Sequence, residues 1–336
     1  MRDGDLLILK GDEVGGLLAG RELEIMQAVE KAYVSHAQQR SSLPHSTFLR
    51  FPDNQRNRII ALPAYLDGDF DIAGLKWVSS FPGNLDKGLD RASAVVILNS
   101  AETGRPEAIL EGSIISAKRT AASAALAAQH LRVNQKDDSA TLIGCGLINY
   151  EVARFLLTAC PEIKRLVVFD LDTKRAGLFR EKCLKTLAVD EVEVVSEIKK
   201  ALTSTTLISM ATTAAKPHVF DLKGCSPSTT ILHVSLRDFS PEVMLSCDNV
   251  VDDVDHVCRA ETSIHLAEQL VGNRDFVRCT LADILQQHSP KRLDDGRIAM
   301  FSPFGLGVLD LAVSKLVRDL GLTQGLGMTV NSFLPS

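Results

Sequence analysis

From Ser139 to Val251 the sequence alternates between short apolar runs of strand length and segments with helical spacing, and this alternation restricts the fold more than any other feature. The strands are expected at residues 141–143, 166–170, 193–195, 206–210, 230–234 and 249–251. Strands that alternate with helices in this way build a parallel sheet covered by helices. The sequence therefore predicts an α/β fold with a doubly wound parallel sheet.

The first of these strands runs directly into a glycine turn. Gly144 and Gly146 follow the apolar run, and an apolar helical stretch comes next. In a dinucleotide-binding turn the first glycine permits the tight bend, the second lets the backbone approach the pyrophosphate, and the helix N-terminus faces the phosphates. Asn149 takes the place of the third small residue and is expected to pack less well. The context favours a Rossmann-type cofactor site over a plain turn.

The next strand ends in an acidic residue, Asp170 of "RLVVFDLD". A carboxylate at this position accepts hydrogen bonds from the ribose hydroxyls and repels a 2′-phosphate, so NAD is the expected cofactor. Lys174 and Arg175 follow closely and keep NADP open as an alternative. The plainer interpretation of Asp170 is a solvated residue at a strand end.

Composition narrows the class of protein. The chain has 336 residues and a formal net charge of -5, without a long basic patch, so nucleic acid is not an expected partner. No apolar run approaches the roughly 20 residues of a membrane-spanning helix, and no membrane partner is expected. The seven cysteines are scattered and form no C-x-x-C pair, which indicates a reducing compartment, the cytoplasm, and no cysteine metal site.

The first part of the chain has a mixed pattern. A short strand "LLILK" and a polar turn precede a helix within 21–40, and strands broken by Pro63 and Gly68 follow. An Ala-rich helix ends at the polar stretch "RVNQKDD", a candidate boundary, and a late helix is expected to return to the first domain. The predicted domains are residues 1–131 with about 307–336, for substrate binding and dimerisation, and residues 132–306, for NAD.

Several motifs, taken in order, resemble those of one family. They are "GLKWVSSFPGN", "RASAVVILNSAETGRP", "EGSIISAKRTAASAALAAQHL", "LIGCGLI" and "HVSLRDFSPEV". From about Leu6 to Leu320 the chain resembles the ornithine cyclodeaminase/μ-crystallin family. The resemblance implies a homodimer in which a mixed α/β domain binds substrate and dimerises and a Rossmann domain holds NAD(P). It also implies hydride transfer between the nicotinamide and an amine or imine carbon beside a carboxylate.

The resemblance assigns roles by motif position. Lys76 and Arg119 correspond to cations that bind the substrate carboxylate, and Asp238 stands where relatives have a catalytic aspartate. Either Lys76 or Asp238 is the expected base. Further substrate-side candidates are Arg91, His45, Arg50 and Phe304. The residues expected to line the cofactor are Ser93, Arg119, Thr120, Gly144, Gly146, Leu147, Ile148, Asp170, Thr212, Ser235, Leu236 and Gly305.

Plainer interpretations stand beside these roles. By alternation alone, Lys76 is a solvent-facing lysine. Asp238 is a candidate helix cap, although Ser240 is the better one and leaves Asp238 available to orient water or move a proton. The acids of "VVDDVDHVCR", beside His256, are expected to face solvent rather than bind a metal.

Within the family, the motifs point to NAD-dependent oxidative cleavage of N-(2-amino-2-carboxyethyl)-L-glutamate. The products are 2-oxoglutarate and L-2,3-diaminopropionate, a precursor for siderophores or other non-ribosomal peptides. Two departures bear on the substrate: His45 replaces a carboxylate-binding arginine, and Ile60 replaces a glutamate of ornithine cyclodeaminases. The alternatives are ornithine cyclodeamination, ketimine or imino-acid reduction, a μ-crystallin-like protein that binds dinucleotide without essential catalysis, and an inactive homologue.

Overall fold

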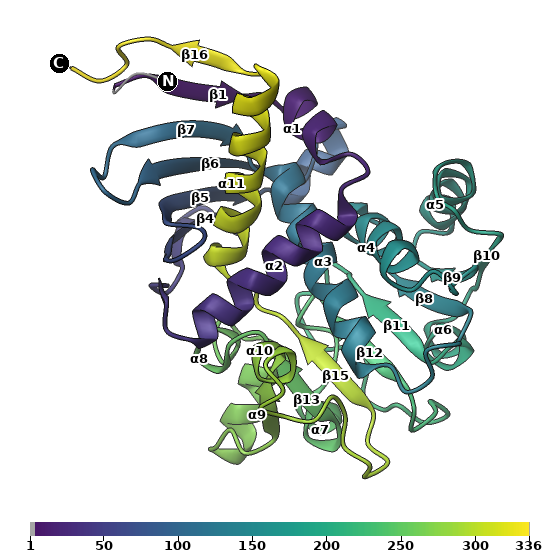
Figure 1. The fold of residues 1–336 in the computed structure, drawn as a ribbon. Helices are drawn as coiled ribbons and strands as arrows, with labels where there is room; N and C mark the ends of the chain where they lie inside the picture. The colour runs from purple at the N-terminus through teal and green to yellow at the C-terminus, as the bar shows by residue number, and fades with distance from the viewer. Residues whose placement is uncertain (1–3, 336) are drawn as a thin grey trace. The chain divides into compact units, whose positions relative to one another are not determined.

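The structure is a computed structural model, and it describes residues 4–335. Residues 1–3 and 336, which the expected first domain includes, lie outside the described residues. The chain divides into two compact units, one formed by residues up to Arg119 and from Leu306 onward, the other by Thr120–Gly305. Each unit contains one eight-stranded sheet (Figure 1). Among the described residues, no helix combines the length and the apolar character needed to cross a membrane.

The first unit has a mixed sheet with the strand order β16-β1-β7-β6-β5-β4-β2, and β3 also pairs with β4. Only β1 and β7 pair in parallel; the other pairs are antiparallel. The strands are β1 (Leu6–Leu9), β2 (Ser41–Ser42), β3 (Thr47–Phe51), β4 (Asn54–Leu66), β5 (Ile72–Ser80), β6 (Ala92–Ser100), β7 (Pro106–Glu111) and β16 (Met328–Val330).

The expected break at Pro63 is wrong, because β4 continues through it. On one side β4 pairs with β5 along this stretch. On the other side β4 pairs with β3 only up to Ala61 and with β2 only from Tyr65. Pro63 therefore falls in the gap between two partner strands, where a missing N–H removes no ladder hydrogen bond on that side.

Three helices of the first unit pack together on its sheet: α1 (Gly11–Leu18), α2 (Glu22–Ala37) and α11 (Gly307–Gln324) (Figure 1). A short 3-10 helix, η1 (Pro82–Lys87), follows β5. The polar turn expected after β1 is wrong, since α1 stands there. Its helical spacing buries Val14, Leu17 and Leu18, and the Glu13 carboxylate accepts a hydrogen bond from the Lys10 amide at 2.8 Å.

The second unit has an all-parallel sheet with the order β10-β9-β8-β11-β12-β15-β13-β14, which confirms the predicted fold class. The last two strands of this unit in chain order, β14 and β15, were not predicted. The strands are β8 (Ser139–Ile143), β9 (Arg165–Phe169), β10 (Glu191–Val194), β11 (Leu207–Met210), β12 (Thr230–His233), β13 (Asp248–Val251), β14 (Val277–Thr280) and β15 (Ala299–Ser302).

Helices connect these strands, and α3 leads from the first unit into the second. The helices are α3 (Ser113–Leu131), α4 (Leu147–Ala159), α5 (Thr173–Thr186), α6 (Ile198–Ser204), α7 (Pro241–Ser246), α8 (Val254–Val257), α9 (Ser263–Val271) and α10 (Leu281–Leu285). The core of the second unit includes Ile208, Ile231 and Met300. Because all strands are parallel, the loops after β8, β9, β11 and β12 emerge at one edge, the usual ligand side of such sheets.

Candidate active site

The turn after β8 has the geometry that a dinucleotide requires. Gly144 has φ +94°, and a Cβ there would stand 2.4 Å from the carbonyl oxygen of Ala211, at the end of the neighbouring strand. Glycine is therefore required at this bend. At Gly146 a Cβ would meet no atom of the described residues within 4 Å, so open space lies over the start of α4.

The side chain of Asn149 stabilises this turn through hydrogen bonds. Its side chain is fully buried, and Nδ2 donates hydrogen bonds of 2.8 Å to the carbonyls of both Ile143 and Gly144. Its Oδ1 accepts a hydrogen bond of 2.7 Å from the Ser209 hydroxyl on β11. The expectation that Asn149 packs poorly is wrong, because the amide satisfies polar groups of the bend that a glycine or alanine leaves unbonded.

Asp170 is held by the same turn. One carboxylate oxygen accepts a hydrogen bond of 2.8 Å from the Cys145 amide, and the other accepts one of 2.9 Å from the Asp172 amide. The adjacent Leu171 is 93% exposed. The residues present fit NAD: the Gly144–Ile148 segment would hold the pyrophosphate at the N-terminus of α4, and Asp170 would bind the ribose.

Asp238, after β12, lies at the centre of a polar cluster. Its side chain is fully buried, and one oxygen lies 3.1 Å from Nε2 of His233 while the other lies 3.0 Å from Nε2 of His218. The hydroxyls of Thr212 and Ser235 also donate to it. Burial raises the pKa of Asp238, but hydrogen bonds and charge from His233, with the two hydroxyls, outweigh burial and hold that pKa below its ordinary range.

The loop that carries Asp238 has a fixed, unusual backbone. Leu236 has φ +70°, a left-handed conformation that a branched side chain rarely adopts. The Leu236 carbonyl accepts a hydrogen bond of 2.7 Å from the Ser263 amide, and Arg237 donates to the Ala260 carbonyl at 2.6 Å. The predicted cap is confirmed, since the Ser240 hydroxyl accepts from the Val243 amide and leaves Asp238 to the cluster.

Asp252, at the end of β13, anchors the loop that contains Phe304 and Gly305. Its carboxylate accepts hydrogen bonds from the Phe304 amide at 2.9 Å and the Gly305 amide at 2.7 Å. A third comes from the Asp253 amide at 2.9 Å. The expectation that this acid faces solvent is wrong: Asp252 is buried, and burial raises its pKa to about 6 against the lowering effect of these amides.

In the first unit, Lys76 and Arg119 share one carboxylate. Lys76 Nζ lies 2.7 Å from Oδ2 of Asp310, and Arg119 Nε lies 3.0 Å from Oδ1. Lys76 also donates to the Ser116 hydroxyl at 3.1 Å. All three charged side chains are buried, so the solvent-facing interpretation of Lys76 is wrong. Burial, together with the nearby Arg119, lowers the pKa of Lys76 to about 8, and Asp310 opposes that shift.

A glycine explains how Asp310 reaches Lys76. Gly74 and Lys76 lie two residues apart on β5 and therefore share one face of the sheet. A Cβ at Gly74 would stand 3.0 Å from the side chain of Leu311 on α11 and 2.3 Å from the Ile97 carbonyl. The missing side chain lets α11 approach β5 closely, and Asp310 lies in the first turn of that helix.

The other substrate-side candidates of the first unit have recorded contacts of their own. Arg91 donates to the Ser80 hydroxyl at 2.8 Å. Ser93, expected at the cofactor, is exposed and bonds Ser79 at 2.8 Å. His45 is exposed in the loop before β3, and the exposed Arg50 lies over the Phe48 ring at 5.6 Å. Their roles in substrate binding stay predictions.

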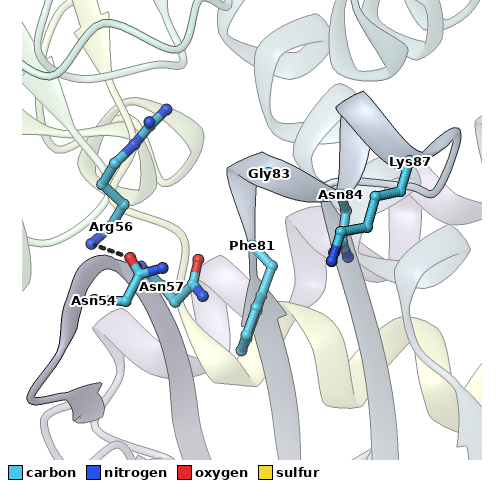
Figure 2. A pocket seen from close by; sticks show the side chains of 7 residues that line it. All are labelled: Asn54, Arg56, Asn57, Phe81, Gly83, Asn84 and Lys87. Carbon is cyan, nitrogen blue, oxygen red and sulfur yellow. Dashed lines mark hydrogen bonds between the residues drawn. The ribbon is translucent and has the colours of Figure 1, made fainter.

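A hollow of about 210 Å³ lies at the end of the first unit's sheet. Figure 2 shows residues from the start of β4 on one side, residues of η1 on the other, and the Phe81 ring between them. The lining residues are Asn54, Arg56, Asn57, Phe81, Gly83, Asn84 and Lys87. None of them is a predicted site residue, although Phe81, Gly83 and Asn84 belong to the "GLKWVSSFPGN" motif.

Three titratable residues of these clusters, Asp310, His218 and His233, are absent from the predicted site residues. Asp310 is the single acid in the apolar run "GVLDLAV". An acid isolated among apolar residues indicates a buried carboxylate with a partner, so this residue could have been predicted. His218 gave no signal, because it lies in a loop whose return beside Phe239 depends on the fold. Within residues 4–335, no group of three or more His, Cys, Asp or Glu side chains is arranged to hold a metal ion.

Comparison with known proteins places this geometry in a family. The chain is 28% identical to N-((2S)-2-amino-2-carboxyethyl)-L-glutamate dehydrogenase of Staphylococcus aureus over 92% of this chain and 93% of the relative. It superposes on the Thermococcus litoralis Δ(1)-pyrroline-2-carboxylate reductase in complex with NADH and L-proline with a TM-score of 0.89, at 26% identity, covering 96% and 100% of the two chains.

A third similar protein is an archaeal alanine dehydrogenase dimer with bound NAD. Its TM-score is 0.86 at 28% identity, with 97% of this chain and 99% of that chain covered. Residues 7–324 match the family described as ornithine cyclodeaminase/mu-crystallin. The chain belongs to the ornithine cyclodeaminase/mu-crystallin family.

Proposed function

We propose that the chain is an NAD-dependent oxidoreductase that cleaves N-(2-amino-2-carboxyethyl)-L-glutamate to 2-oxoglutarate and L-2,3-diaminopropionate. The observation that carries the proposal is the buried trio of Lys76, Arg119 and Asp310. Two cations and one carboxylate give these three groups a net charge of +1 while Lys76 is protonated. A substrate carboxylate would balance that charge, and the proposed substrate has several carboxylates.

A bound NAD⁺ would supply the oxidising power of this reaction, as the acceptor of the hydride on the glutamate Cα beside the bridging nitrogen. Lys76 and Arg119 orient the carboxylate on that carbon. The bridging amine must be neutral for the hydride to leave. Lys76, whose pKa is lowered to about 8, can take that proton only in its neutral form, in which Arg119 alone supplies the positive charge for the carboxylate. Water then adds to the substrate imine, and we propose that the cluster around Asp238 accepts and returns the protons of that step.

The similar Staphylococcus aureus dehydrogenase supports this substrate. The same proposal includes a homodimer, as in the archaeal alanine dehydrogenase, and a place in the synthesis of siderophore or other non-ribosomal peptide precursors. NAD rather than NADP is proposed because Asp170 stands at the ribose position.

A second candidate is an amino-acid dehydrogenase or imino-acid reductase for a smaller substrate. The observation that favours it is the high TM-score of 0.89 to a reductase that holds NADH and L-proline. Ornithine cyclodeamination is less favoured, because Ile60 replaces an acid that the resemblance leads us to expect.

The test is to incubate the purified protein with NAD⁺ and, separately, N-(2-amino-2-carboxyethyl)-L-glutamate, L-alanine, L-proline or L-ornithine. NADH and 2-oxoglutarate in equal amounts from the first substrate alone would support the proposal. NADH from alanine or proline only would favour the second candidate. Proline formed from ornithine without net NADH would indicate a cyclodeaminase.

A further inference from the structure

The carboxylate of Asp238 is already saturated by the protein. It is fully buried, and its two oxygens receive His233 Nε2 at 3.1 Å, His218 Nε2 at 3.0 Å and the two hydroxyls of Thr212 and Ser235. An ionised carboxylate offers about four acceptor positions. Both oxygens of the buried Asp238 are thus in contact with protein groups, which leaves it a poorer acceptor of a proton from water than an exposed neighbour.

Of the two histidines in this cluster, only His218 reaches solvent. Its side chain is 38% exposed, whereas that of His233 is fully buried and bonds Ser302 through Nδ1 at 3.2 Å. The chain also fixes the backbone of His218, because the amides of His218 and Val219 both donate to the Asp238 carbonyl, at 2.8 and 2.9 Å. The imidazole is therefore held at its backbone and at Nε2.

The hydrogen bond to Asp238 determines which ring nitrogen is free. A carboxylate only accepts, so Nε2 of His218 carries the proton and Nδ1 keeps its lone pair. Within residues 4–335, Nδ1 of His218 has no hydrogen-bond partner. A half-exposed imidazole that is oriented by a buried carboxylate and has a free lone pair is the arrangement of a general base.

His218 lies on the ligand side of the second unit. The segment that carries it leaves β11 through Ala211, whose carbonyl oxygen is the atom that a Cβ on Gly144 would meet at 2.4 Å. Thr212 follows in the same segment and donates to Asp238. The glycine turn and the His218–Asp238 pair therefore share the carboxyl edge of adjacent strands β8, β11 and β12.

We propose that His218 is the base that activates water during hydrolysis of the substrate imine, and that Asp238 is its positioning residue. The inference rests on the proposed function. Nδ1 takes a proton from water as the water oxygen bonds to the imine carbon and the C=N π pair moves to nitrogen. The protonated ring returns that proton to the nitrogen, and the amine leaves as the C–N bond breaks. Nδ1 then takes the remaining hydroxyl proton as the C=O bond forms, and the ring passes it to the departing amine, which leaves as an ammonium ion. His233 shares the same carboxylate.

The test is a rapid-mixing experiment with His218→Gln and, as a matched control, His288→Gln, which removes an exposed histidine of the same unit. If His218 acts after hydride transfer, the His218→Gln variant should still release one burst of NADH per active site. Steady-state turnover should then fall about 100-fold, the usual scale for a lost general base. Borohydride should trap the accumulated imine, and the control should behave like the wild type.

Two outcomes would overturn the inference. One is unchanged steady-state turnover in His218→Gln. The other is loss of the burst together with loss of NAD binding, measured by NADH fluorescence, because a structural role would have that effect. Asp238→Asn, which alters the acceptor without removing the ring, should reproduce the burst with slow turnover.

A readout without substrate separates this inference from the proposed function. In protein labelled with ¹⁵N-histidine, the nitrogen shifts of His218 should report the proton on Nε2, and Asp238→Asn should change that tautomer. The Nδ1–H tautomer in the wild type would contradict the inference whichever substrate the protein uses. If the proposed substrate is inert and L-alanine is oxidised, the burst experiment is done with L-alanine, whose imine also requires hydrolysis.

Discussion

Lys76 Nζ lies 2.7 Å from Oδ2 of Asp310, and the two side chains are 3% and 0% exposed. Residues more than two hundred positions apart thus form one buried ion pair, and Arg119 shares its carboxylate at 3.0 Å. Charges this deeply buried are tolerated only with their partners in place. The pair therefore links the stability of the first unit to the positive charge that we propose binds the substrate.

Asp310→Asn should strongly destabilise the protein, because it leaves two buried cations without their shared counter-charge. Removing one partner of a buried pair costs about 3–5 kcal/mol of unfolding free energy. Urea unfolding followed by fluorescence would measure the loss. Asp319→Asn, a half-exposed acid further along α11, is the control and should change stability far less. Equal stability of the wild type and Asp310→Asn would show that the trio is not charged as described.

The free energy of unfolding should change with pH because of Lys76. Its pKa falls from 10.5 in the unfolded chain to about 8 in the folded protein, mainly through burial. Between these values the unfolded state binds the extra proton, so this group's contribution to stability rises with pH from about 8 to 10.5. Lys76→Met should remove that rise, as thermal unfolding of both proteins across the range would show.

Substrate binding should weaken over the same pH range. Above pH 8 Lys76 loses the positive charge that we propose attracts a substrate carboxylate, so KM should increase with pH while Arg119 remains charged. Lys76→Arg keeps the charge and should shift the increase to higher pH, if the larger group is accommodated. A KM that stays constant through pH 9 in the wild type would separate Lys76 from substrate binding.

Replacing Asn149 by Gly or Ala should weaken NAD binding even though it brings the sequence closer to the usual fingerprint. The change removes two 2.8 Å hydrogen bonds to the turn and leaves the buried Ser209 hydroxyl without its acceptor. Each buried group left unbonded costs about 1–3 kcal/mol. Titration with NAD and thermal unfolding would measure both effects, and a double-mutant cycle with Ser209→Ala would isolate the shared bond. Tighter NAD binding by Asn149→Gly would refute this role.

Asp252→Ala should loosen the loop that carries Phe304 and Gly305, because three backbone amides lose their common acceptor. Faster hydrogen exchange at residues 303–306 is the expected local result, with a loss of stability of about 1–3 kcal/mol for the buried donors. Asp252→Asn retains one acceptor oxygen and should show a smaller effect. Unchanged exchange in Asp252→Ala would mean that other contacts fix the loop.

The second unit (Thr120–Gly305), which we call the nucleotide unit, was predictable because the sequence patterns that indicate its strands and turns lie close together along the chain. Six of its eight strands are short apolar runs between helices, and the glycine turn precedes α4 directly in the sequence. β14 and β15 were missed because their neighbours along the chain are polar turns and short helices rather than the regular alternation. The predicted strand break at Pro63 was wrong for a related reason. Whether a strand can contain a proline depends on which strands pair with it there, and the sequence does not show the partners of β4.

The residues of the candidate site were predictable only where they lie in a motif of the family. Lys76, Arg119 and Asp238 came from the family resemblance, and the alternation pattern alone gave the wrong environment for Lys76. The partners Asp310 and His218 lie far away in sequence from the residues they contact, so local pattern could not pair them. At Asn149 the motif itself led to the wrong expectation. The residue departs from the usual glycine or alanine, yet its side chain stabilises the turn through hydrogen bonds.

The first unit can be completed only late in synthesis. Its strand β1 pairs with β16, and α11 packs on its sheet, so both of its last elements come from the C-terminal segment. A ribosome releases every residue of the nucleotide unit before it releases the helix that carries Asp310. Until then, β5 holds Lys76 without its counter-charge, and β1 lacks one of its two neighbours. The first unit must therefore remain unfinished, while the second can already fold, until α11 and β16 have been synthesised.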